Sequence, residues 1–316
     1  MEIGKVLVTG GAGFIGSHVA ERLLREGLAV RILDDLSTGH RENVEAIRSG
    51  ATEKLELAIG DVRSPETVEE ATRDVGAIVH LAALPSVERS VQDPWTSHAV
   101  NVDGTLHLLE AARARKIGRF VLAGSSSVYG DQPELPKTET MRPAPRSPYA
   151  LSKFVAEEYV RLYAELFGLP GITLRYFNVF GPRQDPASPY AAVIPLFLKA
   201  LRKGEPPVIF GDGEQTRDFT FVENVVEANL AALSGPPPHG EAVNVACGER
   251  TSLLELLELL VQATGTPGKP TFAPPRAGDV RDSMASIERA TELLGYRPRV
   301  GLREGIERTV AAFPQD

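Results

Sequence analysis

Short runs of β-branched and aliphatic residues alternate with helix-length segments through the first half of the chain. A strand over 5–9, a helix from Phe14 to about Glu26 and a strand over 29–33 make a βαβ unit. Further apolar runs of strand length occupy 55–59, 77–81, 120–123 and 172–176. Continuous apolar runs are typical of parallel strands that helices cover on both faces. The pattern predicts an α/β protein with a doubly wound parallel sheet.

The pattern changes after Asn178. Loops rich in proline and glycine, among them GPRQDPASP, SGPPPHG and APPRAGDV, enclose shorter elements such as a helix over 253–264. We therefore expect a first domain over 1–177 and a smaller α/β region over 178–316. Segments around 222–247 are expected to return to the first domain, so the boundary in space is not one cut in the sequence.

Composition narrows the class of protein. The 316 residues are 42% hydrophobic and 24% charged, which fits one large globular domain or two smaller ones. The single Cys247 excludes a disulfide scaffold and fits a reducing compartment. The net charge of -8 without a Lys/Arg run argues against nucleic acid. Without a targeting segment or a membrane-length apolar stretch, we predict a cytoplasmic protein with no membrane partner.

A glycine-rich turn follows the first strand and opens the first helix. Gly10, Gly13 and Gly16 suit a tight turn, close approach to a pyrophosphate and close helix–strand packing. By itself this motif also fits a plain strand-to-helix turn. The second strand, however, ends in Asp34 and Asp35, where a carboxylate would bind the hydroxyls of an adenosine ribose. Together they predict a dinucleotide site.

The charge at this strand end bears on the choice of dinucleotide. A carboxylate repels a 2′-phosphate, which favours NAD over NADP, although Arg31 and Arg41 are near in sequence and leave the preference open. The six histidines form no ligand cluster, so we predict no metal site, and His80 is expected to be a packing residue. The adjacent pair at 157 and 158, both glutamate, is expected on an exposed helix face.

A second candidate site lies at the start of a helix. Ser147 suits the N-cap and Pro148 the first turn, and the helical pattern runs to about Phe167. Tyr149 and Lys153, four residues apart, share one face. An ammonium near a phenol favours the ionised phenol and lowers its pKa, which is a general-base device. Alone, this spacing fits a surface tyrosine and a solvated lysine.

With these motifs the sequence resembles the extended short-chain dehydrogenase/reductases, and within them the nucleotide-sugar 4-epimerases, over nearly the whole chain. The matching segments, in order, are TGGAGFIGSH, GDV at 60–62, HLAA at 80–83, NVDGT at 101–105, SSSVYG at 125–130, SPYALSK at 147–153, RYFNVFGPRQDP at 175–186 and RDF at 217–219. The resemblance implies a Rossmann fold, NAD, a UDP-sugar substrate and a homodimer. Its dimer helices would lie around 106–114 and 154–167; burial against the chain's own sheet is the alternative.

The resemblance assigns residues to the cofactor. Asp61 and Val62 would contact adenine, and Phe177 would lie near the nicotinamide. Pro85 stands where UDP-galactose epimerases commonly have a lysine for the pyrophosphate, so that contact is expected to be missing. The full cofactor set is Gly10, Gly13, Phe14, Ile15, Gly16, Asp34, Asp35, Ser37, Thr38, Gly39, Asp61, Val62, Leu81, Ala82, Ala83, Asn101, Tyr149, Lys153 and Phe177.

The resemblance also implies a mechanism. Tyr149, next to Lys153, would take the proton of the sugar 4-hydroxyl while the C4 hydride passes to NAD. Ser125 would hydrogen-bond the reacting oxygen. Rotation of the 4-keto sugar and return of the hydride would then invert C4. Related dehydratases and decarboxylases carry an acid just before the Tyr-Gly pair, where this chain has Ser126 and Ser127, and this favours epimerisation.

The substrate is assigned by the same resemblance. Arg217 and Arg276 would bind the diphosphate, and a small Ser283 stands at a position that is a bulky tyrosine in epimerases restricted to non-acetylated sugars. We therefore expect UDP-N-acetylglucosamine and UDP-N-acetylgalactosamine as substrates, with UDP-glucose and UDP-galactose. Asp185 is expected to disfavour UDP-glucuronate. The full substrate set is Ser125, Ser126, Tyr149, Asn178, Ala192, Val193, Phe210, Arg217, Arg276, Asp279 and Ser283.

Three alternatives remain beside this hypothesis. They are a UDP-glucuronate 4-epimerase, a nucleotide-sugar dehydratase or decarboxylase, and a non-catalytic NAD-binding sensor. A sensor would be expected to have a damaged catalytic set, whereas Ser125, Tyr149 and Lys153 are all present.

Overall fold

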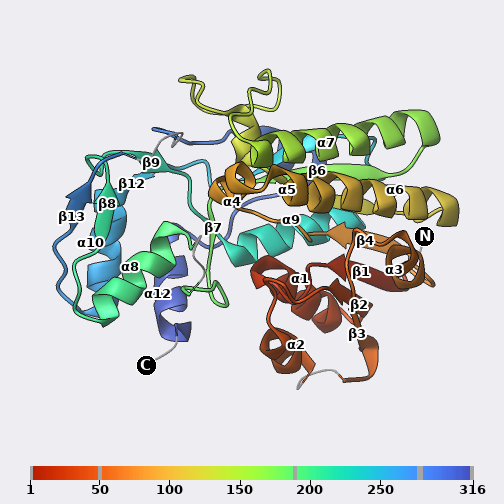
Figure 1. The fold of residues 1–316 in the computed structure, drawn as a ribbon, viewed down its shortest axis with the longest axis horizontal. Helices are drawn as coiled ribbons and strands as arrows, with labels where there is room; N and C mark the ends of the chain where they lie inside the picture. The colour runs from red at the N-terminus through yellow and green to blue at the C-terminus, as the bar shows by residue number, and fades with distance from the viewer. Residues whose placement is uncertain (1–2, 49–51, 188–190, 276–279, 314–316) are drawn as a thin grey trace.

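The structure is a computed structural model and describes residues 3–48, 52–187, 191–275 and 280–313. Its larger part is built on a parallel sheet with the strand order β3-β2-β1-β4-β5-β6-β11 (Figure 1). These strands are β1 (Lys5–Thr9), β2 (Ala29–Asp34), β3 (Leu55–Ile59), β4 (Ala77–His80), β5 (Phe120–Ser125), β6 (Gly171–Tyr176) and β11 (Ala242–Val245). The predicted α/β, doubly wound sheet is confirmed, and the order reverses between β1 and β4, where such sheets bind ligands.

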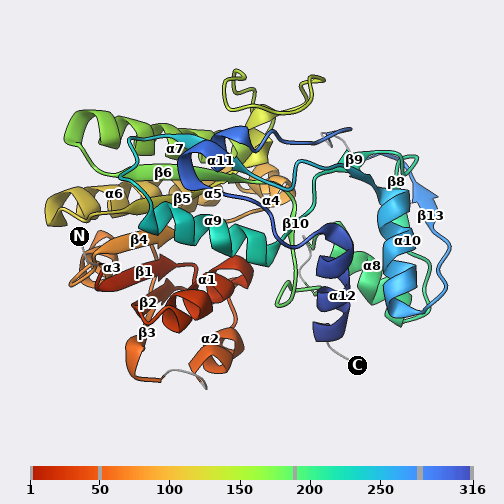
Figure 2. The same cartoon turned by 180° about the vertical axis from the view of Figure 1, so that it is seen from behind.

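Helices cover both faces of this sheet (Figure 1 and Figure 2). Val6 and Val8 of β1 point into one core, and Leu7 points into the other. The first core is closed by α1 (Phe14–Arg25), α2 (Arg41–Arg48), α9 (Val222–Ser234) and α11 (Glu288–Leu294). The second is closed by α3 (Pro65–Ala71), α6 (Gly104–Arg115) and α7 (Pro148–Phe167). Because both faces are buried, the strands read as continuous apolar runs rather than alternating ones.

Shorter elements lead from the sheet into the helices at its carboxyl edge. Two short helices precede α6, and the chain between β5 and α7 projects beyond the helical layer (Figure 1). These elements are α4 (Val87–Gln92), α5 (Pro94–His98), a π-helical turn η2 (Ala99–Asp103) and η3 (Ser126–Tyr129), whereas η1 (Thr52–Lys54) directly precedes β3.

The smaller region has its own core and lies beside the carboxyl edge of the sheet (Figure 2). Its helices are α8 (Val193–Arg202), α10 (Leu253–Thr264) and α12 (Leu302–Ala312). The short strands form three pairs, namely β7 (Val179–Phe180) with β10 (Thr220–Phe221), β8 (Val208–Phe210) with β13 (Thr271–Ala273), and β9 (Thr216–Arg217) with β12 (Thr251–Ser252). Phe197, Leu256 and Ile306 join the three helices in one apolar core.

The chain returns to the large sheet after residue 178, as the sequence pattern predicts. Strand β11 pairs in parallel with β6, and α9 packs against α1. One further return is not visible in the sequence. Ala290 and Tyr296 are buried in the same core as α1 and α9, so the segment around α11 also belongs to the sheet.

The described residues offer neither a membrane-spanning helix nor a cluster of metal-ligating side chains. No helix in that part of the chain combines the length and the apolar character that crossing a bilayer requires. No group of three or more His, Cys, Asp or Glu side chains there is placed to hold a metal ion.

Candidate active site

The glycine turn after β1 is shaped by close backbone approach. Gly10 has φ +68, and a Cβ on it would lie 2.7 Å from the backbone nitrogen of Ala82, which follows β4. A Cβ on Gly16 would lie 2.1 Å from the carbonyl oxygen of Gly10. No side chain caps α1 at Gly13. A tight turn against an open helix N-terminus is the arrangement that accepts a dinucleotide pyrophosphate, so these residues fit the expected cofactor.

Asp34 is fixed at the end of β2. Its carboxylate accepts hydrogen bonds from the backbone amides of Ala12 and Leu36, both at 2.9 Å. Burial raises the pKa of Asp34, and these two amides partly offset the rise. Each carboxylate oxygen has more than one lone pair, so Asp34 retains capacity for ribose hydroxyls. Asp35 is exposed and accepts hydrogen bonds from the amide and hydroxyl of Ser37.

The nearby cation Arg31 is engaged elsewhere. Its guanidinium pairs with Glu56 on β3 at 2.6 Å and donates to the carbonyls of Ala71 and Arg73. Arg31 is the one of the two nearby arginines that lies on β2, and these contacts hold its guanidinium. The acidic character of the strand end, which favours NAD over NADP, therefore persists in the fold.

Other residues assigned to the cofactor gather along the carboxyl edge of the sheet. Asn101 accepts a hydrogen bond from the amide of Leu84 at 2.9 Å and donates to Ser152 on α7 at 3.0 Å. It thus links the loop after β4 to the catalytic helix. Asp61 is paired with Arg63, which lowers the pKa of Asp61. The remaining members lie in the first turn of α1 (Phe14, Ile15), the loop after β2 (Thr38, Gly39), the turn after β3 (Val62) and the segment after β4 (Leu81, Ala83).

Phe177 does not occupy the place the resemblance implies. Its side chain is 0% exposed and packs with Val128, Tyr129, Ala246 and Ala285. A fully covered ring offers no surface to a nicotinamide, so the expected contact is corrected to a packing role. In the sequence, nothing in the segment RYFNVF distinguishes a cofactor contact from a packing role for Phe177.

The three predicted catalytic residues come together at the junction of β5 and α7. Ser147 caps α7 by accepting a hydrogen bond from the Ala150 amide at 3.1 Å. Lys153 is buried and its ammonium donates to the Ala123 carbonyl of β5 at 2.9 Å. Ser125 ends β5, and its hydroxyl interacts with the Tyr149 phenol. The strand end and one helix face therefore place a hydroxyl, a phenol and an ammonium in one site.

The electrostatics differ from the prediction. Burial raises the pKa of the Tyr149 phenol, and its hydrogen bond with Ser125 only partly offsets this rise. Burial also lowers the pKa of Lys153 to about 8. The predicted lowering of the Tyr149 pKa by Lys153 is thus corrected, because desolvation outweighs it and the ammonium is bound to the Ala123 carbonyl.

Glu157 corrects the expectation of an exposed helix face. It lies one turn beyond Lys153 and is 4% exposed. Both carboxylate oxygens accept hydrogen bonds from Arg175 of β6, from Nε at 2.9 Å and from Nη2 at 2.5 Å. Glu158 beside it is partly exposed and pairs with Arg161. Positions 149, 153 and 157 follow a helical repeat, and this spacing is the signal that could have found Glu157.

Arg175 extends this pair into a buried network. Its Nη1 donates to the Tyr129 hydroxyl at 2.7 Å, and that hydroxyl donates to Asn244 of β11 at 2.6 Å. The guanidinium also lies over the Tyr129 ring, 4.9 Å from its centre. Burial raises the pKa of Tyr129 to about 12, so its hydroxyl remains a donor. The network ties α7 to β6, η3 and β11 below the catalytic residues.

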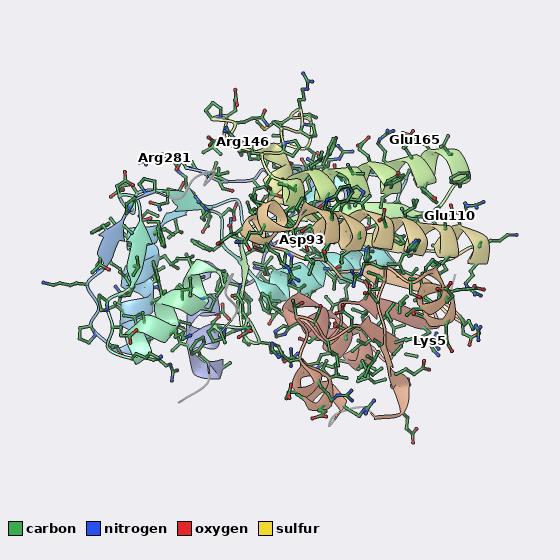
Figure 3. All side chains as sticks on the ribbon, viewed as in Figure 1. Lys5, Asp93, Glu110, Arg146, Glu165 and Arg281 are labelled. Atoms are coloured by element: carbon green, nitrogen blue, oxygen red, sulfur yellow. The ribbon has the colours of Figure 1, made fainter. Side chains whose placement is uncertain are left out.

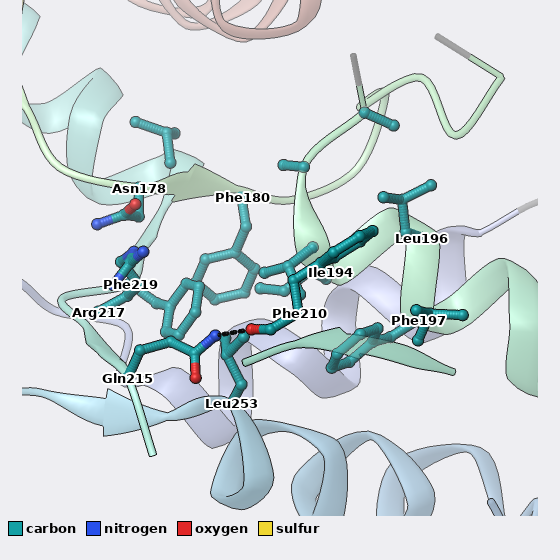
Figure 4. Close-up of a pocket in the computed structure, with 15 residues that line it drawn as sticks. Asn178, Phe180, Ile194, Leu196, Phe197, Phe210, Gln215, Arg217, Phe219 and Leu253 are labelled. Atoms are coloured by element: carbon teal, nitrogen blue, oxygen red, sulfur yellow. Dashed lines mark hydrogen bonds between the residues drawn. The ribbon is translucent and has the colours of Figure 1, made fainter. Parts of the chain in front are cut away.

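A cavity of about 270 Å³ opens in the smaller region. Asn178 and Arg217 lie at one end of it, and Leu196 and Phe197 lie at the other (Figure 4). The Arg217 guanidinium donates to the carbonyls of Thr216 and Arg281. Five predicted substrate residues line this one cavity, namely Asn178, Ala192, Val193, Phe210 and Arg217.

The remaining substrate residues lie nearby or outside the described part of the chain. Ser283 is 9% exposed, and its amide donates to the Thr216 carbonyl of β9 at 3.1 Å. Ser126 begins η3, directly after Ser125. Arg276 and Asp279 lie outside the described residues. The Oδ2 atom of Asp185 lies 3.7 Å from Nε2 of His40, and His40 belongs to the loop after β2.

Comparison with known proteins agrees with this geometry. Residues 6–246 match the model of the NAD dependent epimerase/dehydratase family. The UDP-glucose 4-epimerase of Mycolicibacterium smegmatis is 43% identical over 98% of both chains. The structure of UDP-N-acetylglucosamine 4-epimerase from Methanobrevibacter ruminantium superposes with a TM-score of 0.93 at 37% identity, covering 99% of both. That of Thermus thermophilus UDP-glucose 4-epimerase with NAD gives 0.89 at 40% identity, covering 98% of both.

A parallel sheet with a glycine turn, and a Ser-Tyr-Lys site at its carboxyl edge, define the class. The chain belongs to the NAD dependent epimerase/dehydratase family. It is an enzyme of the isomerase class, a UDP-sugar 4-epimerase whose cofactor is NAD.

Proposed function

We propose that this enzyme interconverts UDP-N-acetylglucosamine and UDP-N-acetylgalactosamine, and also UDP-glucose and UDP-galactose. The observation that carries the proposal is the small side chain at Ser283, whose backbone is fixed by the Thr216 carbonyl. A hydroxymethyl group leaves room for an acetamido substituent where a tyrosine ring would not. The similarity to the methanogen UDP-N-acetylglucosamine 4-epimerase supports the same choice.

The catalytic roles follow from the positions of the side chains. NAD, when bound, supplies a hydride acceptor and donor at the sugar C4. The Tyr149 phenolate takes the proton of the 4-hydroxyl and later returns it, while the Ser125 hydroxyl holds the same oxygen by a hydrogen bond. Lys153, anchored on the Ala123 carbonyl, places its ammonium beneath this site at neutral pH because its pKa of about 8 keeps it mainly charged. Ser126 adds a second hydroxyl next to the sugar.

The division of labour between the two parts of the chain is part of the proposal. Residues 1–177, with 222–247, bind NAD through the predicted cofactor residues other than the corrected Phe177. Residues 178–316 mainly bind the sugar nucleotide, with Arg217 and Arg276 on the diphosphate and Asn178, Ala192, Val193, Phe210 and Asp279 around it. The shared cavity of the described members of this set supports the assignment.

We also propose a homodimer in which α7 takes part. Leu108 and Val160, on the predicted dimer helices, are buried against the chain's own sheet. Leu166 and Phe167 at the end of α7, however, are 68% and 51% exposed. Exposed large apolar side chains on one helix suit a protein partner. Light scattering should give the mass of two chains, and a monomer would remove this proposal.

The substrate proposal is tested by NMR of UDP-N-acetylglucosamine with purified protein and no added cofactor. Appearance of UDP-N-acetylgalactosamine is expected, because NAD returns to its starting state in each turnover and stays bound. Parallel samples contain UDP-glucose and UDP-glucuronate, and Tyr149→Phe serves as the inactive control. Conversion of UDP-glucose alone would contradict the assignment of Ser283. Conversion of UDP-glucuronate alone would replace the proposal with a uronate epimerase, which Asp185 is expected to disfavour.

A further inference from the structure

A buried carboxylate lies where the smaller region meets the sheet. Asp218 is 0% exposed. Its Oδ1 accepts a hydrogen bond from the amide of Cys247 at 2.9 Å, and its Oδ2 accepts from the amides of Gly248 and Ala285 at 3.0 and 3.2 Å. Within the described part of the chain, the hydrogen-bond donors to the Asp218 carboxylate are thus backbone amides from two segments that are distant in sequence. The reaction described above uses no proton or charge of this residue.

The segments joined at Asp218 are those that carry the proposed substrate residues. Arg217 immediately precedes it in the chain. The Asp218 carbonyl accepts a hydrogen bond from the Asn178 side chain at 3.1 Å. Ala285 lies two residues after Ser283, in a segment that also bonds to Thr216. Two of these proposed contacts, Asn178 and Arg217, are therefore tied to the backbone of Asp218, and the third, Ser283, lies in a segment that its side chain binds.

A carboxylate suits this position better than any neutral side chain. Its two oxygens together accept three backbone amides, whereas a carboxamide has one accepting oxygen and turns N–H groups toward the remaining amides. A buried polar donor that loses its acceptor carries the cost of desolvation, so the segment would move until the amide found another partner. Such a shift would displace Arg217 or Ser283 while leaving α7 and its bonds to β5 and β6 unchanged.

We propose that Asp218 is a positioning residue for the sugar-nucleotide site. Its carboxylate, bound by the amides of Cys247, Gly248 and Ala285, fixes its own backbone, and with it Arg217 and Asn178, against the segment that carries Ser283. The inference rests on the proposed function of these residues. It assigns Asp218 to substrate affinity rather than to the proton and hydride steps. The ionisable groups around it are Cys247, Glu249 and Tyr296. Burial raises the pKa of the Cys247 thiol and of the Tyr296 phenol, so both stay neutral, whereas the negative charge of Glu249 adds to the effect of burial on the pKa of Asp218.

The test compares Asp218→Asn with Asp212→Asn. Asp212 is an exposed residue of the same region and pairs at 3.0 Å with Arg281, which is labelled in Figure 3. We expect Asp218→Asn to raise KM for the UDP-sugar, and to weaken binding of UDP in calorimetry at pH 7.5, by about tenfold. Its kcat and its bound NAD should stay near those of the wild type, whereas the lost buried hydrogen bonds should lower its melting temperature. Asp212→Asn should match the wild type in every measurement.

Unchanged KM and UDP affinity in Asp218→Asn would overturn the inference, as would a loss of kcat with unchanged KM. Wild-type protein that neither binds UDP nor converts a UDP-sugar would reject the proposed function itself, and the inference would be withdrawn with it. Wild-type binding of UDP separates the two failures.

A second measurement remains decisive if Asp218→Asn does not fold. Burial raises the pKa of Asp218 to about 6. Once the carboxyl is protonated, its O–H is a donor that faces a backbone N–H, and that hydrogen bond is lost. Because the diphosphate of a UDP-sugar remains ionised between pH 5 and 8, wild-type KM should rise as the pH falls through about 6. A KM that stays flat over this range would reject the positioning role.

Discussion

The catalytic helix and the sugar-nucleotide region are held in place by different kinds of interaction. Helix α7 is fixed by side chains that meet side chains of the sheet, above all Glu157 on Arg175. In the smaller region, by contrast, the segments that carry the proposed substrate residues are joined by backbone hydrogen bonds between short strands and by Asp218, whose side chain accepts hydrogen bonds from backbone amides. The first arrangement belongs to long, regular elements, and the second to loops.

This difference matches what each region does. Proton and hydride transfer depend on positions held to fractions of an ångström, which rigid packed elements provide. Recognition of different sugars depends on which side chains the loops present, so it can change while the sheet stays the same. The same comparison predicts that substitutions in the two regions will affect different measured quantities.

The largest effect is expected from removing the proton acceptor. Tyr149→Phe deletes only the phenolic oxygen, so kcat should fall by about 10²–10⁴-fold. Bound NAD and the melting temperature should change little, because the ring and its neighbours remain. Quantitative NMR of the epimer products gives kcat, and absorbance of the released nucleotide gives the cofactor content. A variant that kept more than about a tenth of wild-type kcat would show that another group takes the proton.

The next largest effect concerns stability rather than chemistry. Glu157→Ala leaves Arg175 buried without its carboxylate, and we expect a loss of about 3–5 kcal/mol in the free energy of unfolding. Glu158→Ala is the matched control on the same helix; its exposed pair with Arg161 should contribute within about 0.5 kcal/mol. Urea denaturation measures both. Equal losses in the two variants would mean that the buried pair does not fix α7.

A smaller, selective effect is expected in the sugar-nucleotide region. Ser283→Tyr should lower kcat/KM for UDP-N-acetylglucosamine by more than about tenfold, because the ring fills the space proposed for the acetamido group. Turnover of UDP-glucose should be spared, and it serves as the internal control. If both sugars lose activity equally, Ser283 does not select between them.

The last expected effect is a pH dependence of stability. The pKa of Lys153 is lowered from 10.5 to about 8 in the folded protein, so between these values the unfolded chain binds more protons than the folded one. The contribution of this group therefore rises as the pH rises from 8 to 10.5 and is lost as the pH falls through 8. The measurement compares the free energies of unfolding of wild type and Lys153→Met, both free of nucleotide. Over this pH range the wild type should gain stability relative to the variant. A constant difference would contradict the buried position of the ammonium.

Local patterns in the sequence were sufficient for the fold class, and they also predicted the core of the site. Strands buried on both faces read as apolar runs wherever they occur, and the chain between them has room only for crossover helices. The glycine turn after β1 and the Tyr149–Lys153 spacing are also local, since one depends on backbone conformation and the other on the helical repeat. Resemblance then supplied the residues that lie far apart in sequence, such as Asn178 and Arg217, which the structure brings to one cavity.

What only the tertiary structure decided is the environment of individual side chains. Glu157 and Glu158 are alike in sequence, and burial of the first depends on Arg175, 18 residues away. Phe177 was assigned to the cofactor, but segments around 129, 246 and 285 cover it. The three amides on Asp218 come from 29, 30 and 67 residues away.

The pKa of the catalytic phenol is another property that the tertiary structure decided. Sequence spacing correctly placed Lys153 on the face of Tyr149, but the direction of the pKa shift was wrong because desolvation is set by everything packed around the phenol. The sequence thus determined which residues can do the chemistry, since backbone periodicity and residue type are written locally. Burial, charge balance and loop positions were decided by the tertiary structure, because each is a sum over neighbours that only the folded chain brings together.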